Sequence, residues 1–328
     1  MNSPQSGPAG RRPPTSSGAR VVALGGGHGL AASLRALRRV TDDVTAIVAV
    51  SDDGGSSGRL REEFDVVPPG DLRMALAALC GDDTWGRTWS RVVQHRFAGD
   101  GPLAGHSLGN LLITALWEET GDIVTGLDWV GALLGAHGRV LPVATVPLEV
   151  VADVRGLHPE DPSILERVVG QVSVATTRGE VVRLHIEPRE APACPDAVKA
   201  IGEADAVLLG PGSWFTSVLA PLQVRGIGQA VSRTPGRVVV VLNLEAQTGE
   251  TDGFSPQRHL EVLHRQMPSL RVDTVLADPE HVPDVDALAA AARELGARLA
   301  LAPVAARDGT PRHDVDLLAS ALGGVLTP

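Results

Sequence analysis

Hydrophobic positions along the chain alternate between short continuous runs and runs with helical spacing. Residues 20–24 form a short apolar run, and in residues 30–40 the apolar side chains recur every three or four positions. Residues 43–53 form a continuous apolar run that ends in two acids, which is typical of a strand buried on both faces of a parallel sheet. Residues 20–53 therefore predict a strand, a glycine turn, a helix and a second strand, a right-handed βαβ unit.

The same alternation returns in the second half of the chain. Residues 204–222 predict a strand, a glycine loop and a helix, and strands and helices then alternate up to a closing helix at the C-terminus. Such a rhythm indicates an α/β fold, Rossmann-like and doubly wound, with a mostly parallel sheet. Further helices are predicted as helical insertions over 70–80, 83–97, 106–121 and 128–138.

Three segments depart from this alternation. Residues 1–19 are rich in Pro, Ser, Gly and Arg and predict a disordered tail, which leaves 20–328 as a single domain. Residues from about 139 to 190 carry alternating β-branched side chains, which predict a small antiparallel β-rich insertion. Residues 54–58, Gly-Gly-Ser-Ser-Gly, predict a flexible loop without regular structure.

Composition limits the function classes. The net charge is −10, with 29 basic and 39 acidic side chains, which argues against a nucleic-acid binder and against attachment to anionic lipid. No apolar run is long enough for membrane insertion, and the N-terminus lacks a signal sequence. Cys80 and Cys194 lie far apart without metal-type spacing, so we expect a reduced, cytoplasmic protein.

The first glycine loop is a candidate phosphate site. Gly27-His28-Gly29-Leu30-Ala31-Ala32 fits the dinucleotide pattern G-x-G-x-x-A, and Gly26 precedes it. Glycines let the backbone approach a phosphate, and the following helix offers free N–H groups. A tight strand–helix turn without a ligand would also explain these glycines.

The acid loop, residues 51–60, is a more specific signal of a ligand site than the glycine loop. Asp52 and Asp53 end a strand at the edge where open α/β sheets bind ligands, and they could hold Mg²⁺ through waters or accept bonds from sugar hydroxyls. The amides of Gly54 and Gly55, together with Ser56 and Arg59, could contact phosphate. The alternative is a surface loop with solvated acids.

Two further helix starts carry polar groups. Gly212 and Ser213 precede a predicted helix, where they could bind an anion or simply cap the helix. Asn110 could contact a base or a sugar, and His106 is an acid, a base or a hydrogen-bonded core group. No residue is assigned as catalytic, and the candidates are Asp52, Asp53 and His106. With Lys199 as the sole lysine, a Walker-type phosphate loop is excluded.

Together, "GGGHGLAASLRAL", "SDDGGSSGRL", "GHSLGNLL", "ADAVLLGPGSWFTSVL" and "QTGETDGF" resemble the YvcK, or gluconeogenesis factor, family. That family shares a superfamily with CofD, the 2-phospho-L-lactate transferase of coenzyme F420 synthesis. The resemblance runs from about Val21 to the final helices. One departure is His28, because the family's loop usually reads G-G-G-T-G. If the threonine hydroxyl contacts phosphate, His28 alters that contact.

The resemblance implies a cytoplasmic, Rossmann-like protein that binds a UDP-sugar such as UDP-N-acetylglucosamine. It also implies a regulatory role in cell shape and cell-wall synthesis during gluconeogenic growth. Partners that it leaves open are a homodimer and proteins of cell-wall synthesis. The implied ligand-binding residues are those of the glycine loop and the acid loop with Asn110, Gly212 and Ser213.

Three functions follow, in this order. The first is a nucleotide-sugar-binding regulatory protein with no certain cofactor. The second is a CofD-like, Mg²⁺-dependent transferase that moves a phosphate-bearing group from a nucleotide donor. The third is an NAD-dependent oxidoreductase, which only the G-x-G-x-x-A pattern suggests.

Overall fold

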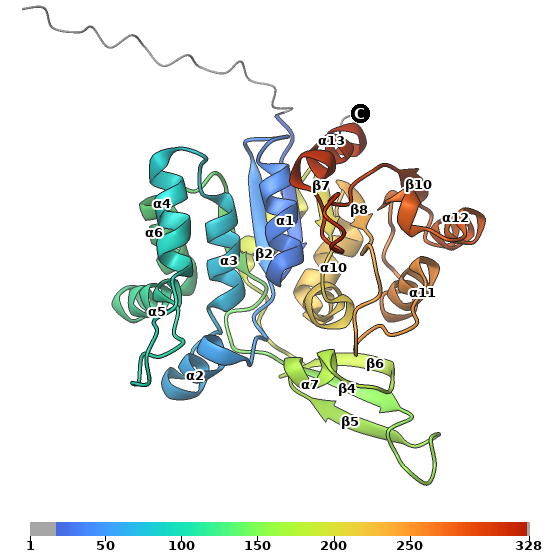
Figure 1. Ribbon diagram of the computed structural model, residues 1–328, viewed down its shortest axis with the longest axis horizontal. Helices are drawn as coiled ribbons and strands as arrows, with labels where there is room; N and C mark the ends of the chain where they lie inside the picture. The colour runs from blue at the N-terminus through green and yellow to red at the C-terminus, as the bar shows by residue number, and fades with distance from the viewer. Residues whose placement is uncertain (1–17, 327–328) are drawn as a thin grey trace, which may run out of the picture.

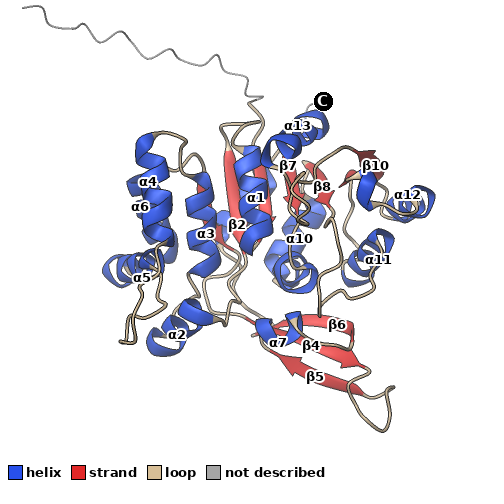
Figure 2. Ribbon diagram, viewed as in Figure 1, coloured by secondary structure: helices blue, strands red, loops and turns tan. Residues whose placement is uncertain are grey.

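A seven-stranded, all-parallel sheet organises the fold in the computed structural model, which describes residues 18–326. Its strand order is β10-β9-β8-β7-β1-β2-β3, and every neighbouring pair is parallel (Figures 1 and 2). The strands are short, and those inside the sheet are almost entirely buried, as continuous apolar runs predict, whereas the edge strand β10 is partly exposed. Their bounds are β1 Val21–Gly25, β2 Val44–Val48, β3 Arg139–Pro142, β7 Ala206–Leu209, β8 Arg237–Val241, β9 Thr274–Ala277 and β10 Arg298–Leu301.

Helices cover both faces of this sheet, so the Rossmann-like, doubly wound expectation is confirmed. On one face α1 (Gly27–Leu37) packs between α3 (Gly70–Leu79) and α13 (Val315–Leu326), as Figure 1 shows. On the other face α8 (Pro195–Glu203) packs against α10 (Arg225–Arg233). Further helices are α4 Thr84–Gln94, α5 Leu108–Thr120 and α6 Ile123–Leu134, which pack around α3, and α11 Pro256–Gln266 and α12 Val285–Glu294, which pack together.

A second sheet of three antiparallel strands projects from the body (Figure 1). It has the order β5-β4-β6, with β4 Glu149–Arg155, β5 Leu165–Val169 and β6 Glu180–Glu187, and the short helix α7 (Gln171–Ala175) follows β5. The predicted β-rich segment therefore exists, but its first strand was misplaced. β3 pairs in parallel with β2 because residues 140–142 are apolar and buried in the main core.

Two local predictions are wrong. Residues 54–58 do not form a flexible loop, because α2 (Gly55–Phe64) begins there and buries Ser56, Ser57 and Gly58. A Cβ on Gly58 would lie 2.3 Å from the Asp53 carbonyl oxygen, so this glycine allows a close approach inside a helix. The helix predicted over 128–138 starts earlier, where Asp122 accepts a bond from the Thr125 N–H, and it ends at Gly135 in a left-handed conformation.

The second strand–glycine–helix unit contains an unusual helix. After β7 the chain forms a π-helical stretch, η1 (Trp214–Leu219), which continues into α9 (Ala220–Gln223). A short 3₁₀ turn, η2 (Pro279–His281), follows β9. Within residues 18–326 no helix is long and apolar enough to cross a membrane. The predicted tail falls almost entirely outside the described residues.

Strand order reverses between β1 and β7, since β1 leads to β2 on one side while β7 leads to β8 on the other. In open α/β sheets, ligands bind outside the carboxyl ends of the strands at this switch point. The loops that follow β1, β2 and β7 are the glycine loop, the acid loop and the Gly212–Ser213 loop. All three therefore leave the same edge of the sheet, facing α2 and the small sheet (Figure 1).

Candidate functional site

The two glycine loops are in direct contact at the switch point. A Cβ on Gly29 would lie 2.1 Å from the Pro211 carbonyl oxygen and 2.7 Å from the Gly212 Cα. Since real Cβ atoms do not approach so closely, Gly29 is required by the contact between the loops themselves. Gly27 has a φ of +59°, which other residues rarely adopt. The loop geometry therefore explains these glycines before any ligand is considered.

A cavity of about 800 Å³ opens beside these loops. This volume suits a ligand of nucleotide size, because pockets for such molecules span about 300–1,000 Å³. His28 is exposed and lines the cavity with Gly29, so the residue that departs from the family pattern faces the candidate ligand space. Arg35 of α1 and Arg312 before α13 bring positive charge to its wall, and Asp314 and Asp316 bring negative charge.

Asn243 holds the second glycine loop in place. Its side-chain oxygen accepts a hydrogen bond from the Gly212 N–H at 2.9 Å, and its side-chain nitrogen donates to the Gly212 carbonyl at 2.8 Å. Asn243 follows β8 and also lines the cavity. The sequence analysis missed this residue, although its place directly after a buried strand was a usable signal.

Glu250 occupies the start of η1. Its side chain is 4% exposed and accepts a bond from the Ser213 hydroxyl at 2.7 Å. It also accepts the backbone N–H groups of Trp214, Phe215 and Thr216 at 2.8–3.1 Å. Burial raises the pKa of Glu250, and these hydrogen bonds oppose the shift. The amides at this helix start, where an anion could have bound, are thus bonded to a carboxylate of the chain itself.

Asp71 lies against the glycine loop, and Asp52 lies against Gly70, the residue before Asp71. The Asp52 Oδ2 and the Ser57 Oγ both lie so close to Gly70 that a Cβ there would be 2.6 Å and 2.3 Å away, respectively. A Cβ on Gly26 would lie 2.5 Å from the Asp71 Oδ2. Burial, and then the charge of Asp52, raise the pKa of Asp71 to about 7, while the Gly27 amide opposes this. The sequence analysis predicted the helix over 70–80 but did not single out Asp71 as a site residue.

Asp53 points elsewhere than its neighbour. Its Oδ1 accepts the Val172 N–H at 3.1 Å, and its Oδ2 lies against Gly170, where a Cβ would be 2.6 Å away. The carboxylate therefore attaches α7 and the small sheet to the acid loop. The Asp52 carboxylate accepts the Gly54 N–H at 3.1 Å.

Asp52 and Asp71 are a further pair of carboxylates that could hold Mg²⁺, while the predicted pair of Asp52 and Asp53 stays a prediction. Two like-charged carboxylates near one point, one with a raised pKa, favour a cation between them. Mg²⁺ typically uses one or two carboxylates and completes its shell with water and substrate phosphates. Residues 18–326 contain no cluster of three or more His, Cys, Asp or Glu side chains arranged for a metal, so phosphate oxygens and waters would supply the other ligands.

Ser56, His106 and Asn110 form one buried network. The Ser56 Oγ lies 3.0 Å from the His106 Nδ1 and accepts a bond from the Asn110 Nδ2 at 3.1 Å. Burial lowers the pKa of His106, and the nearby charge of Arg59 adds to this effect. Arg59 donates to the Ala104 carbonyl at 2.8 Å. The structure thus joins Ser56 with His106 and Asn110, which lie 50 and 54 positions away in the sequence.

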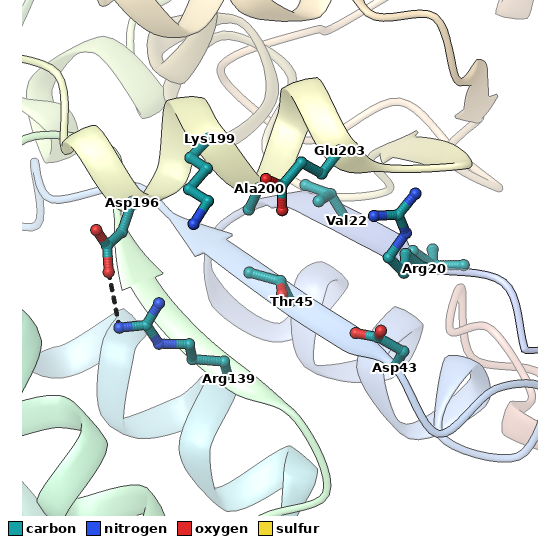
Figure 3. Close-up of a pocket in the computed structure, with 10 residues that line it drawn as sticks. Arg20, Val22, Asp43, Thr45, Arg139, Asp196, Lys199, Ala200 and Glu203 are labelled. Carbon is teal, nitrogen blue, oxygen red and sulfur yellow. Dashed lines mark ion pairs between the residues drawn. The ribbon is translucent and has the colours of Figure 1, made fainter.

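Another cavity, of about 250 Å³, lies at the opposite edge of the sheet (Figure 3). It is formed between the starts of β1 and β2 and the helix α8, and Lys199 and Glu203 line it. Arg139 closes one end through an ion pair with Asp196 at 2.8 Å. Because it lies at the amino ends of the strands, this cavity is separate from the site at the carboxyl edge.

Comparison with known proteins identifies the family. The family described as 2-phospho-L-lactate transferase CofD matches residues 21–301. A Mycobacterium tuberculosis protein named "Putative gluconeogenesis factor" is 52% identical over 93% of this chain and 90% of its own length. The "Gluconeogenesis factor" of Listeria monocytogenes is 36% identical, covering 94% of this chain and 95% of its own.

A solved structure supports the same assignment. The crystal structure of a UPF0052 family member from Bacillus halodurans matches with a TM-score of 0.81 and 32% identity, over 93% of this chain and 98% of that one. Fold, motifs and relatives agree over most of the chain. The chain belongs to the CofD family and, within it, to the gluconeogenesis factor, or YvcK, group.

Proposed function

We propose that this protein binds a nucleotide sugar of the UDP-sugar class at the switch point and acts as a regulator of cell-wall synthesis and cell shape during gluconeogenic growth. The observation that carries the proposal is the cavity of about 800 Å³ that begins at Gly29 and Gly212. It has the place and the size expected for a nucleotide ligand. Arg35 and Arg312 provide charge for the diphosphate, and Asn243 offers an amide near the second loop.

A regulatory role fits this site better than catalysis by a side-chain nucleophile. Ser56 is buried in the network with His106 and Asn110, and Ser213 is bonded to Glu250. Neither hydroxyl lines the large cavity. Partners in such regulation would be cell-wall synthesis proteins, with the protein itself as a cytoplasmic monomer or homodimer.

Isothermal titration calorimetry with UDP-N-acetylglucosamine tests the binding step. UDP, UDP-glucose, GDP, GTP and NAD⁺ serve as comparison ligands, each with and without Mg²⁺. A response to NAD⁺ alone would replace the proposal with the oxidoreductase reading. A response to none of the uridine nucleotides would refute it.

A cavity-filling variant locates the binding site. Ala32→Leu adds volume to the cavity wall on α1, so we expect it to weaken UDP-N-acetylglucosamine binding at least tenfold. Ala290→Leu makes the same change at an exposed position of α12 and is the matched control. Equal affinities in the two variants would place the ligand outside this cavity.

A CofD-like transferase is the second candidate, and the Asp52–Asp71 pair favours it. In phosphoryl-type transfer, catalysis consists mostly of positioning and charge neutralisation, which two carboxylates with Mg²⁺ can supply. Asp52→Asn and Asp71→Asn should each abolish a Mg²⁺-dependent increase in nucleotide affinity. Detecting no product with any nucleotide donor, while nucleotide binding persists, would leave the regulatory function alone.

A further inference from the structure

Arg73 is a buried cation without an anionic partner. It is 5% exposed, and its Nε donates to the Asn110 side-chain oxygen at 2.9 Å. Its Nη1 donates to the Gln94 side-chain oxygen, and its Nη2 has no hydrogen-bond partner within residues 18–326. Both partners are neutral amides, although buried charges are normally paired with an opposite charge.

Two more arginines surround the same segment. Arg59 donates to the Ala104 carbonyl and Arg96 to the Gly105 carbonyl, both at 2.8 Å. Arg73 packs against the start of α5, because a Cβ on Gly109 would be 2.8 Å from its Cγ and Cδ atoms, and it is close enough to Arg96 to feel that charge. In the part of the chain that the structure describes, none of the three arginines forms an ion pair.

Asp52 and Asp71 influence the charge of Arg73, but within residues 18–326 neither forms an ion pair with it. Asp52 bonds to the Gly54 amide, and Asp71 faces the glycine loop. An arginine guanidinium is charged at neutral pH, here in a protein whose net charge is −10. A local positive cluster in an acidic protein can concentrate anions at one place.

We propose that Arg59, Arg73 and Arg96 form a second anion site, which takes the phosphate group of a small molecule other than the nucleotide sugar. Arginine is well suited to this ligand, since its planar guanidinium donates two parallel hydrogen bonds to phosphate. The site lies over the 104–110 segment, beside the Ser56–His106 network and outside the large cavity. The protein would thus sense or bring together two ligands.

Inorganic phosphate is the probe. We expect it to raise the melting temperature of the full chain more than sodium chloride does at equal ionic strength. Arg59→Gln and Arg96→Gln change exposed side chains, so both variants should fold, and each should weaken phosphate binding about tenfold through loss of a charge-assisted contact. Arg91→Gln removes the same charge from an exposed position of α4 without an ion pair and is the matched control.

The outcomes separate this site from nucleotide-sugar binding. Phosphate affinity that falls in Arg59→Gln and Arg96→Gln but not in Arg91→Gln, with UDP-N-acetylglucosamine affinity unchanged by saturating phosphate, supports the second site. Equal phosphate affinity in all three variants, or no response of the wild type, overturns it. Competition between phosphate and UDP-N-acetylglucosamine also overturns it, since phosphate would then occupy the large cavity. If the nucleotide sugar fails to bind while the phosphate result holds, only the proposed function is lost.

Discussion

Replacing Asp71 with asparagine should stabilise the ligand-free protein in a pH-dependent way. The unfolded carboxyl ionises near pH 3.8 and the folded one near pH 7, because burial and the charge of Asp52 disfavour the folded carboxylate. Between these pH values the folded state binds the extra proton, so rising pH removes stability until Asp71 is ionised in both states. Asp71→Asn has no carboxyl to ionise and avoids this loss.

The magnitude follows from the size of the shift. A difference of about three pKa units corresponds to about 4 kcal/mol in the free energy of unfolding above pH 7. Asp71 retains some exposure, and water screens part of the interaction, so we expect about 2 kcal/mol. The asparagine oxygen can still accept the Gly27 N–H, which limits any loss from the substitution itself.

Urea unfolding from about pH 4 to about pH 8 measures the effect. The difference in the free energy of unfolding between Asp71→Asn and wild type should be near zero at about pH 4 and should grow as the pH approaches 7. Asp42→Asn, an exposed carboxyl, should show no such gap. Asp52→Asn should shift the wild-type transition to lower pH by removing the neighbouring charge. A gap that is constant with pH, or an Asp71→Asn variant less stable than wild type at pH 8, would refute the reasoning.

Three further substitutions test the loops at the switch point. Gly29→Ala should lower the free energy of unfolding by more than about 2 kcal/mol, because its Cβ would collide with a backbone carbonyl. Gly324→Ala should not destabilise the protein, because the space around Gly324 is open. Chemical unfolding compares the two variants. Glu250→Ala should lower the free energy of unfolding by about 2–4 kcal/mol, because it leaves buried amides unpaired. Glu245→Ala, at an exposed position, should leave that free energy almost unchanged. His28→Thr should keep the melting temperature and tighten UDP-N-acetylglucosamine binding in calorimetry; weaker binding would show that the histidine contacts the ligand.

Sequence patterning predicted the main sheet because its strands are buried on both faces. The runs at β1, β2, β7 and β8 are apolar at almost every position, which fits strands buried on both faces. In the helices between them, apolar residues recur every three or four positions. α2 was missed because local propensity opposes a helix that begins Gly-Ser-Ser-Gly. Burial of Ser56 and Ser57 against α5 and α3 overrides that propensity, and such burial cannot be read from a short window.

The positions of the loops in the fold could be predicted from the sequence, but the side chains that hold these loops could not. The glycine and acid loops carry local signals, so their meeting at one edge of the sheet follows from strand order. Asp71, Asn243 and Glu250 act on residues 31 to 45 positions away, and no local pattern marks such partners. Asp53 shows the reverse case, since it is adjacent to Asp52 in the same acid loop, yet its carboxylate bonds to the Val172 N–H of α7.

Carboxylates of the chain itself lie at both glycine loops, which changes how an acidic protein could accept a diphosphate. Asp71 faces Gly26 and Gly27, and Glu250 bonds the amides behind Ser213, so neither helix start offers its full positive end to a ligand. An incoming anion would meet like charge unless Asp71 takes up a proton or shares a cation with Asp52. Because the pKa of Asp71 is about 7, a small free-energy change near neutral pH is enough to neutralise it. Ligand binding at this edge should therefore be linked to protons or to Mg²⁺, and that linkage suits a protein that responds to metabolic state.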